Sequence, residues 1–291
     1  MTTEVLRYTA FSEDPAGGNP AGVVLDASAL DEAAMLDVAA RLGYSETAFL
    51  TGPASPPAPG EAAPEPGRGF TVRYFSPKAE VPFCGHATVA AAVALAERIG
   101  PGQLVFETRA GTVPVSVTAE DGHLRATLTS VVPHVEDIAA ADLAEALAAL
   151  GWPAGDLDPE LPPRVAYAGA RHLVIGAATR ARLADLAYDF GRLEALMRRL
   201  DLTTVQLVHR AGPTLFHVRD PFPVGGVVED PATGAAAAAF GAYARQLALV
   251  PEDAVLTLHQ GEDMGRPGVL TVELRAGDPR VRVAGAGVRI P

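Results

Sequence analysis

The segments HATVAAAVALA (residues 86–96) and AAAAAFGAYARQLAL (residues 235–249) decide the fold of this 291-residue chain. Both are rich in alanine and apolar on all sides, with almost no charge until their ends. A helix without a polar face must be surrounded by protein, and small alanines let a sheet approach closely. We therefore expect each helix to lie inside a curled sheet. An ordinary buried helix is the alternative for either segment taken alone.

The two segments also begin alike. Cys84-Gly85-His86 introduces the first, and Asp230-Pro231-Ala232-Thr233-Gly234 introduces the second. The glycines that align, Gly85 and Gly234, are separated by close to half of the chain. This indicates two copies of one plan: an α+β fold with two pseudo-symmetric domains. We place the domains at residues 1–130 and 131–291, and the last strand is free to return to the first domain.

Local patterns predict a few further elements. Apolar and alternating runs indicate strands near residues 5–11, 22–25 and 46–50. Ser28, with Asp31 three residues later, resembles the N-terminal cap of a helix that ends at Gly43. Residues 52–69 hold six prolines and four glycines, which is typical of a surface loop.

Composition excludes several classes of protein. The net charge of −12 and the scattered arginines argue against nucleic-acid binding. No apolar run reaches the roughly 20 residues of a membrane span, and no secretory signal is present, so we expect a cytoplasmic protein. Cys84 is the only cysteine, which excludes an internal disulfide and a pair of catalytic thiols. The seven histidines lack zinc-ligand spacing, so no metal site is predicted, and the chain has no phosphate-binding loop.

The two helix starts suggest how an acidic protein could bind a small anion. The first amides of a helix have no intrahelical partner and carry a partial positive charge. The backbone amides of Gly85, His86, Gly234 and Ala235 would hold a carboxylate if both helix starts face one site. The alternative is that the glycines only permit tight packing.

Four motifs occur in a fixed order: NPAGVV (19–24), SETAF (45–49), FCGHAT (83–88) and EDPATG (229–234). Together they resemble the PhzF-like family of phenazine-biosynthesis proteins, which has the diaminopimelate-epimerase-like fold. The resemblance covers nearly the whole chain. It implies two domains, each a β-barrel-like sheet around a central helix, with the active site between them. It also implies a homodimer that needs no cofactor.

The resemblance makes Glu46 the general acid/base. The family's founding reaction isomerises trans-2,3-dihydro-3-hydroxyanthranilate by moving a proton between ring carbons. A carboxylate that takes and returns such a proton needs partial burial to raise its pKa. Without the resemblance, a lone strand glutamate is more often a solvated surface residue. His86 is expected to assist at the substrate, and the alternative is a capping or packing histidine.

The remaining site residues have more modest roles. By resemblance Asp230 orients polar groups of the substrate, although an aspartate there can also cap the helix. Asn19 would order the site or only supply turn chemistry. Related racemases use two thiols, but Pro231 stands opposite Cys84 here, so we expect Cys84 to be a small buried hydrophobic residue. Ala235 stands where many relatives have serine, which removes a hydroxyl from the expected carboxylate site.

These observations favour a cofactor-independent isomerase that moves a proton on a small carboxylate-bearing substrate. Two alternatives remain open. One is a one-base epimerase or tautomerase of an amino or hydroxy acid. The other is a carboxylate-binding protein that keeps the fold without turnover, because a fold hosts several chemistries.

Overall fold

The computed structural model describes residues 3–54 and 65–291, which form two compact units. One unit comprises Met1–Thr129 together with Ala284–Pro291, and the other comprises Ser130–Val283. The last strand, β17 (Asp278–Arg289), therefore begins in the second unit, and its residues from 284 onward belong to the first. Most of the proline-rich stretch expected to be a surface loop, residues 55–64, lies outside the described residues.

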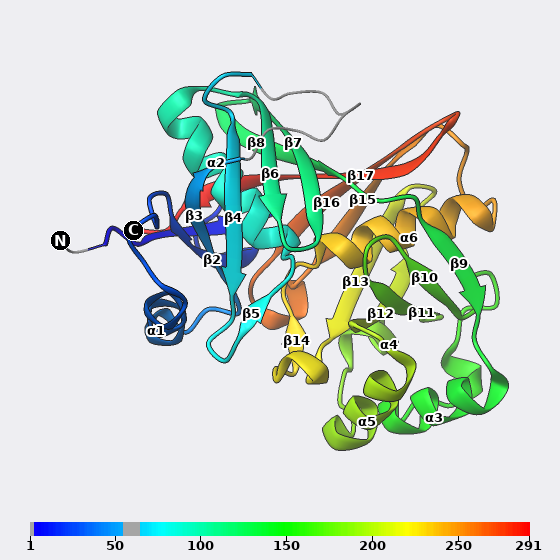
Figure 1. The fold of residues 1–291 in the computed structure, drawn as a ribbon. Coiled ribbons are helices and arrows are strands. Elements are labelled where there is room, and N and C mark those ends of the chain that lie inside the picture. The colour runs from blue at the N-terminus through cyan, green and yellow to red at the C-terminus, as the bar shows by residue number, and fades with distance from the viewer. Residues whose placement is uncertain (1–2, 55–64) are drawn as a thin grey trace. The chain divides into compact units, whose positions relative to one another are not determined.

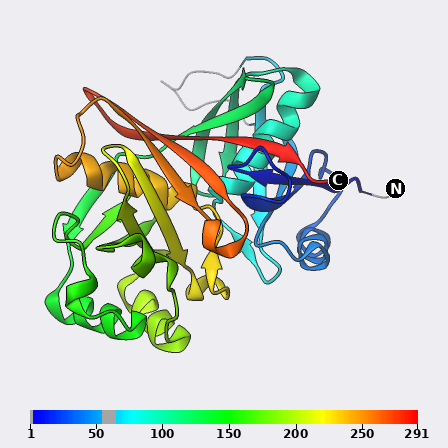
Figure 2. The same ribbon diagram turned by 180° about the vertical axis from the view of Figure 1, so that it is seen from behind.

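The first unit is a closed barrel around one helix (Figure 1). Its strands are β1 (Leu6–Ala10), β2 (Asn19–Val24), β3 (Thr47–Pro53), β4 (Gly69–Phe75), β5 (Glu80–Val81), β6 (Gly102–Thr108), β7 (Gly111–Glu120) and β8 (His123–Thr129), and its helices are α1 (Glu32–Leu42) and α2 (Gly85–Ile99). Eight strands close the ring in the order β1–β2–β3–β4–β6–β7–β8–β17. β17 pairs antiparallel with β1, and Figure 2 shows these two strands side by side near the ends of the chain.

Helix α2 fills this barrel, as the sequence predicts. Every residue from His86 to Ala96 is buried, and the helix packs against β1, β2, β3, β7 and β8. Alanine at the close contacts allows strands on all sides to approach the helix. Gly287 of β17 shows how close: a Cβ there would lie 2.9 Å from a methyl carbon of Val93.

The second unit is built around α6 (Gly234–Gln246). Its strands are β9 (His134–Asp137), β10 (Arg164–Tyr167), β11 (Arg171–Gly176), β12 (Thr204–Arg210), β13 (Leu215–Pro221), β14 (Glu229–Asp230), β15 (Ala254–Gln260) and β16 (Gly268–Arg275), and its other helices are α3 (Ala140–Leu150), α4 (Arg180–Ala184) and α5 (Phe190–Leu200). Three short 3₁₀ turns complete the unit: Ala154–Asp156, Pro223–Gly225 and Glu262–Met264. Helix α6 packs on β9, β10, β11 and β16. Helices α3, α4 and α5 form a separate core with Trp152 and residues of β11 and β12, including Leu173 and Leu207.

The second unit repeats the strand plan of the first. β2 and β3 are parallel, as are β11 and β12, and the connection contains one helix, α1, in the first unit and two, α4 and α5, in the second. β4 and β6 are parallel, as are β13 and β15, and here the connection contains the apolar helix α2 or α6. The remaining neighbours within each series are antiparallel. This agreement confirms the predicted α+β fold with two pseudo-symmetric halves.

Two element ends differ from the predictions. The N-cap of α1 is Asp31, whose carboxylate accepts a hydrogen bond from the Ala34 amide at 2.8 Å, and Ser28 lies outside the helix. Helix α6 ends at Gln246 and does not continue to Leu249. Ala248 has a φ of 53°, a left-handed conformation that a helix cannot continue through.

Candidate functional site

Glu46, Cys84 and His86 meet in the first unit although Glu46 is far from the other two in sequence. Glu46 directly precedes β3, Cys84 is the N-cap of α2, and His86 lies in the first turn of that helix. The carboxylate atom Oε2 of Glu46 lies 3.4 Å from His86 Nε2, and the Cys84 thiol donates to it at 3.6 Å. The thiol sulfur is 3.3 Å from His86 Nδ1. We call these three side chains the Glu46 cluster.

The Glu46 cluster is largely buried. The side chains of Glu46 and His86 are 15% and 6% exposed, and Cys84 is 9% exposed. Ser45 Oγ lies 3.2 Å from His86 Nε2, so the imidazole has a second polar neighbour. A carboxylate with this little water around it and an imidazole beside it can exchange protons with a bound molecule.

The barrel holds in place both the start of β3, which carries Glu46, and the start of α2, which carries Cys84 and His86. The Gly22 amide of β2 donates to the backbone oxygen of Glu46 at 3.2 Å. On the helix side, the Thr88 hydroxyl donates to the Cys84 backbone oxygen at 2.7 Å and lies 2.7 Å from the hydroxyl of Tyr74 on β4. The start of α2 is therefore held by buried polar contacts to the same sheet that carries Glu46.

The start of α2 also supplies the amides expected for anion binding. Gly85 and His86 are its first two residues, and the first amides of a helix have no intrahelical partner. Asn19 is buried at the start of β2, which runs parallel to β3. Asn19 and Glu46 thus lie at the same end of neighbouring strands.

Cys84 is buried, as predicted, but it does more than fill apolar space. Its sulfur faces a carboxylate and an imidazole. The sequence gives no sign of this because the contact to Glu46 spans 38 residues and depends on how β3 and α2 meet.

In the second unit, Asp230 is held in a compact polar turn before α6. Its carboxylate accepts a hydrogen bond from the Thr233 hydroxyl at 2.6 Å, and Thr233 is the N-cap of the helix. Asp230 is therefore not the helix cap considered above. Gly234 and Ala235 are the first two residues of α6, the positions that correspond to Gly85 and His86 in α2.

Gln260 of β15 organises this turn and was not singled out from the sequence. It is 1% exposed. Its amide nitrogen donates to the backbone oxygen of Asp230 at 2.8 Å and to the Thr233 hydroxyl at 2.9 Å. Its amide oxygen accepts from the Thr233 backbone nitrogen at 2.9 Å. Only the parallel pairing of β13 with β15, a long-range feature, brings Gln260 here.

A second buried network adjoins Asp230. The Thr204 hydroxyl donates to Asp220 Oδ1 at 2.8 Å and lies 2.8 Å from His172 Nδ1. All three residues are at most 1% exposed, and Asp220 pairs with Asp230 across β13 and β14. Burial raises the pKa of Asp220 well above its usual range, and the nearby Asp230 and Glu229 add to this rise. Burial lowers the pKa of His172 to about 3.

The strand that carries Asp230 is anchored by an ion pair. Glu229 of β14 and Arg219 of β13 are both buried, and the guanidinium binds the carboxylate through two hydrogen bonds of 2.9 and 2.5 Å. Such a two-point contact fixes orientation as well as distance. Arg219 also donates to the Ala184 backbone oxygen at 2.7 Å, which ties β13 to the end of α4.

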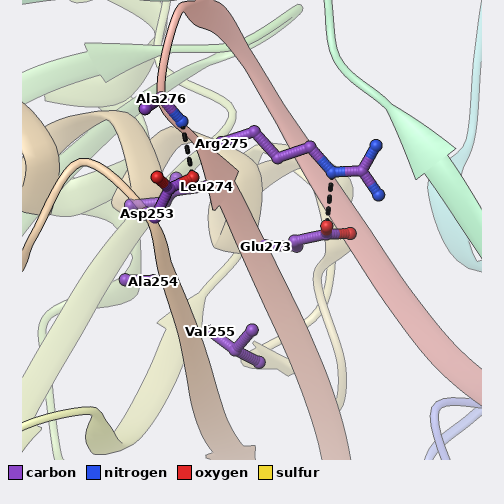
Figure 3. Close-up of a pocket in the computed structure, with 7 residues that line it drawn as sticks. All are labelled: Asp253, Ala254, Val255, Glu273, Leu274, Arg275 and Ala276. Carbon is purple, nitrogen blue, oxygen red and sulfur yellow. Dashed lines mark hydrogen bonds and ion pairs between the residues drawn. The ribbon is translucent and has the colours of Figure 1, made fainter.

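A pocket elsewhere in the second unit involves none of these residues. It lies along β15 and β16 and is lined by Asp253, Ala254, Val255, Glu273, Leu274, Arg275 and Ala276 (Figure 3). Two contacts engage its charged groups: Asp253 accepts from the Ala276 amide at 2.7 Å, and Arg275 pairs with Glu273 at 2.5 Å.

Among residues 3–54 and 65–291, the Glu46 cluster is the one group of three carboxylate, thiol and imidazole ligands close enough to share a metal ion. Across the same residues, no helix combines the length and hydropathy needed to cross a membrane.

The fold defines the class of protein. The structure of a predicted epimerase from Pseudomonas aeruginosa matches with a TM-score of 0.84 at 28% identity, over 100% of this chain and 98% of that one. A hydroxyproline epimerase from Agrobacterium vitis shares the fold, with a TM-score of 0.62 at 13% identity over 98% and 90% of the two chains. The chain thus has an epimerase-like fold.

Sequence comparison identifies the family. The model for phenazine biosynthesis-like proteins matches residues 8–290, and the chain belongs to this PhzF-like family. The uncharacterized isomerase YddE of Escherichia coli O157:H7 is 33% identical, over 99% of this chain and 96% of its own. The trans-2,3-dihydro-3-hydroxyanthranilate isomerase of Pseudomonas aeruginosa is 31% identical, over 97% and 90% of the two chains. The resemblance stated from the four motifs is confirmed.

Proposed function

We propose that the protein is a cofactor-independent isomerase in which Glu46 moves a proton on a small carboxylate-bearing substrate. The observation that carries the proposal is the Glu46 cluster: a nearly buried carboxylate with an imidazole nitrogen at 3.4 Å, beside the first amides of α2. Membership of an isomerase-containing family supports the same chemistry.

In this mechanism one carboxylate performs both proton steps. Glu46 takes a proton from a carbon of the substrate, which leaves a delocalised anion, and returns it to another carbon on the same face. The substrate carboxylate binds at helix-start amides, those of Gly85 and His86 and those of Gly234 and Ala235. His86 assists through its contact with Glu46. Asp230 orients polar groups of the substrate, and Asn19 helps order the site.

Trans-2,3-dihydro-3-hydroxyanthranilate is the first substrate to test, because a relative that is 31% identical is named for its isomerisation. This chain has Ala235 where many relatives have serine, so we do not assign the protein to phenazine biosynthesis. A different carboxylate is the expected natural substrate if the anthranilate derivative reacts slowly. We further infer a homodimer, which sedimentation equilibrium would test.

The experiment compares turnover of this compound by the wild type, Glu46→Gln and Glu120→Gln. Glu120 is an exposed carboxylate at the end of β7, so it controls for the loss of one negative charge in the same unit. General acid/base catalysis contributes about 10²–10⁴-fold, so Glu46→Gln should lose at least that much turnover while Glu120→Gln keeps it. Full turnover by Glu46→Gln would exclude Glu46 as the base.

The product distinguishes the isomerase from a one-base epimerase. A shifted double bond indicates the isomerase. Inversion of one stereocentre without such a shift indicates the epimerase. Thermal stabilisation by carboxylates with no turnover of any of them would favour the binding protein.

A further inference from the structure

We propose that the Glu46 cluster is also a binding site for a zinc-class divalent metal ion, and that the bound ion inhibits proton transfer. The metal-binding part rests only on the geometry of three side chains. The inhibitory part rests on the proposed function, because it assumes that Glu46 is the base.

The spacing of the ligand atoms carries the proposal. Tetrahedral zinc, with bonds of about 2.0–2.3 Å, places its ligand atoms about 3.3–3.6 Å apart. In the Glu46 cluster the carboxylate and imidazole atoms are 3.4 Å apart, and the carboxylate and thiol atoms are 3.6 Å apart. The thiol is 3.3 Å from one ring nitrogen of His86 and 3.8 Å from the other. Small side-chain rotations can therefore direct all three groups at one ion.

The chemistry of the three groups selects the metal. Thiolate and imidazole ligands suit zinc and similar ions, whereas magnesium and calcium prefer sets of oxygen ligands. A thiolate and a carboxylate together balance the double positive charge of the ion. Three protein ligands leave one tetrahedral position open, as in catalytic zinc sites. Here we expect that position to hold water.

The surroundings of the Glu46 cluster also favour a bound cation. The cluster is largely buried, so the ligands are already brought together and little side-chain freedom remains to be lost. The net charge of −12 raises the local concentration of cations around the protein. An ion bound at Glu46 Oε2 engages one carboxylate oxygen and makes the other less basic, so Glu46 can no longer accept the substrate proton. Metal binding and catalysis therefore exclude each other.

Cobalt titration tests the site without any substrate. Because Cys84 is the only cysteine, a thiolate-to-cobalt charge-transfer absorption can arise from this residue alone. Metal-free protein titrated with Co²⁺ should develop this band at one ion per chain, and Zn²⁺ should displace it. Cys84→Ser should abolish the band. Cys84→Ser, His86→Gln and Glu46→Gln should each weaken Zn²⁺ binding by about 100-fold or more, since changes to residues that only hold metal ligands in place already cost about 10–100-fold.

A matched control separates this cluster from surface histidines. His217 and His259 stack at 5.4 Å beside Glu262, and His217 Nδ1 lies 2.6 Å from that carboxylate. His217→Gln should leave the charge-transfer band unchanged. The proposal is overturned if Co²⁺ gives no such band up to millimolar concentration, or if Zn²⁺ binding survives Cys84→Ser and is lost in His217→Gln. Circular dichroism of the metal-free variants checks that each has folded.

The two proposals fail separately. If the wild type turns over the substrate fully but shows no cobalt band, the proposed metal site is excluded and Glu46 remains the proposed base. A normal cobalt band together with unchanged turnover by Glu46→Gln would support the metal site and exclude Glu46 as the base. Where both hold, Zn²⁺ should inhibit wild-type turnover competitively with the substrate.

Discussion

At the scale of single residues, the sequence motifs located most of the proposed reacting groups but not their partners. Glu46, His86 and Asp230 stand in recognisable motifs, and the structure places Glu46 beside His86. The contacts of Cys84 and Gln260 were not predictable, since they link residues 27 to 38 positions apart. Such contacts depend on strand register, which local patterns do not specify.

Ala235 gives a prediction about substrate affinity. Ala235→Ser would add a hydroxyl at the second residue of α6, beside the amides proposed to bind the carboxylate. One added hydrogen bond to a charged group contributes about 1.5–3 kcal/mol. The Michaelis constant for trans-2,3-dihydro-3-hydroxyanthranilate should therefore fall by roughly 10-fold or more. An unchanged or raised Michaelis constant in steady-state kinetics would show that position 235 does not contact the carboxylate.

His172 gives a prediction about acid stability. Its pKa is about 3 in the folded protein and near 6.5 when unfolded, so only the unfolded chain gains its proton between these values. The free energy of unfolding should therefore fall by about 1.4 kcal/mol per pH unit as the pH drops from 6.5 toward 3. His172→Asn, which can still donate to Thr204, should remove this part of the slope. Urea unfolding at pH 5 and pH 7 measures it.

Asp220 should change the pH dependence of stability in the opposite direction to His172. Its pKa is raised in the folded protein, so the folded state holds a proton that the unfolded state has lost. The stabilisation that this proton gives the folded state is present in full below pH 3.8. It is lost as the pH rises through the pKa that Asp220 has in the folded protein. Asp220→Asn should consequently steepen the loss of stability on acidification. An identical pH slope in the wild type and in both variants would contradict the assigned protonation states.

At the scale of elements, the two apolar helices were the strongest signal in the sequence. Composition alone predicted that α2 and α6 would be buried, because neither offers a polar face to water. The end of α6 and the cap of α1 were harder to predict. The end of α6 depends on the backbone conformation of Ala248. The cap of α1 depends on whether Ser28 or Asp31 reaches a free backbone amide.

Gly241 tests how tightly α6 is packed. A Cβ at this position would lie 2.7 Å from Val272 and 2.9 Å from Val281. Overpacking costs about 1–3 kcal/mol, more than the roughly 1 kcal/mol that alanine gains over glycine in a helix. Gly241→Ala should therefore destabilise the protein by about 1–2 kcal/mol.

Gly191 of α5 is the matched control for this substitution. The nearest atom to its added Cβ is 3.9 Å away. Gly191→Ala should leave stability unchanged or raise it by about 0.5–1 kcal/mol. Urea unfolding of both variants measures the difference. Equal effects would show that α6 is not closely surrounded.

At the scale of the whole molecule, the repeat was foreseen from the similar helix starts, and the matched order of parallel and antiparallel pairs bears it out. The extra core of α3, α4 and α5 in the second unit was not foreseen. These helices have ordinary amphipathic patterns, which do not reveal which face of a sheet they cover.

The end of the chain should be essential to the first unit. Residues 284–291 belong to it, and β17 pairs with β1 from Gly287 to Arg289. Truncation after Val283 would open the barrel and expose Phe11, which is fully buried. We expect loss of cooperative unfolding in the first unit, seen as lost amide protection in β1 by hydrogen exchange. Removal of Pro291 alone, which is exposed, is the control and should change nothing.

The fate of the transferred proton shows whether Glu46 is the group that carries it. The carboxyl proton held by Glu46 should exchange with solvent before it is returned, so trans-2,3-dihydro-3-hydroxyanthranilate incubated in deuterium oxide with the wild type should give product that carries deuterium at the newly protonated carbon. Glu46→Gln should give none, and Glu120→Gln should match the wild type. Deuterium incorporation at the wild-type rate by Glu46→Gln would contradict the assignment of Glu46 as the group that moves the proton.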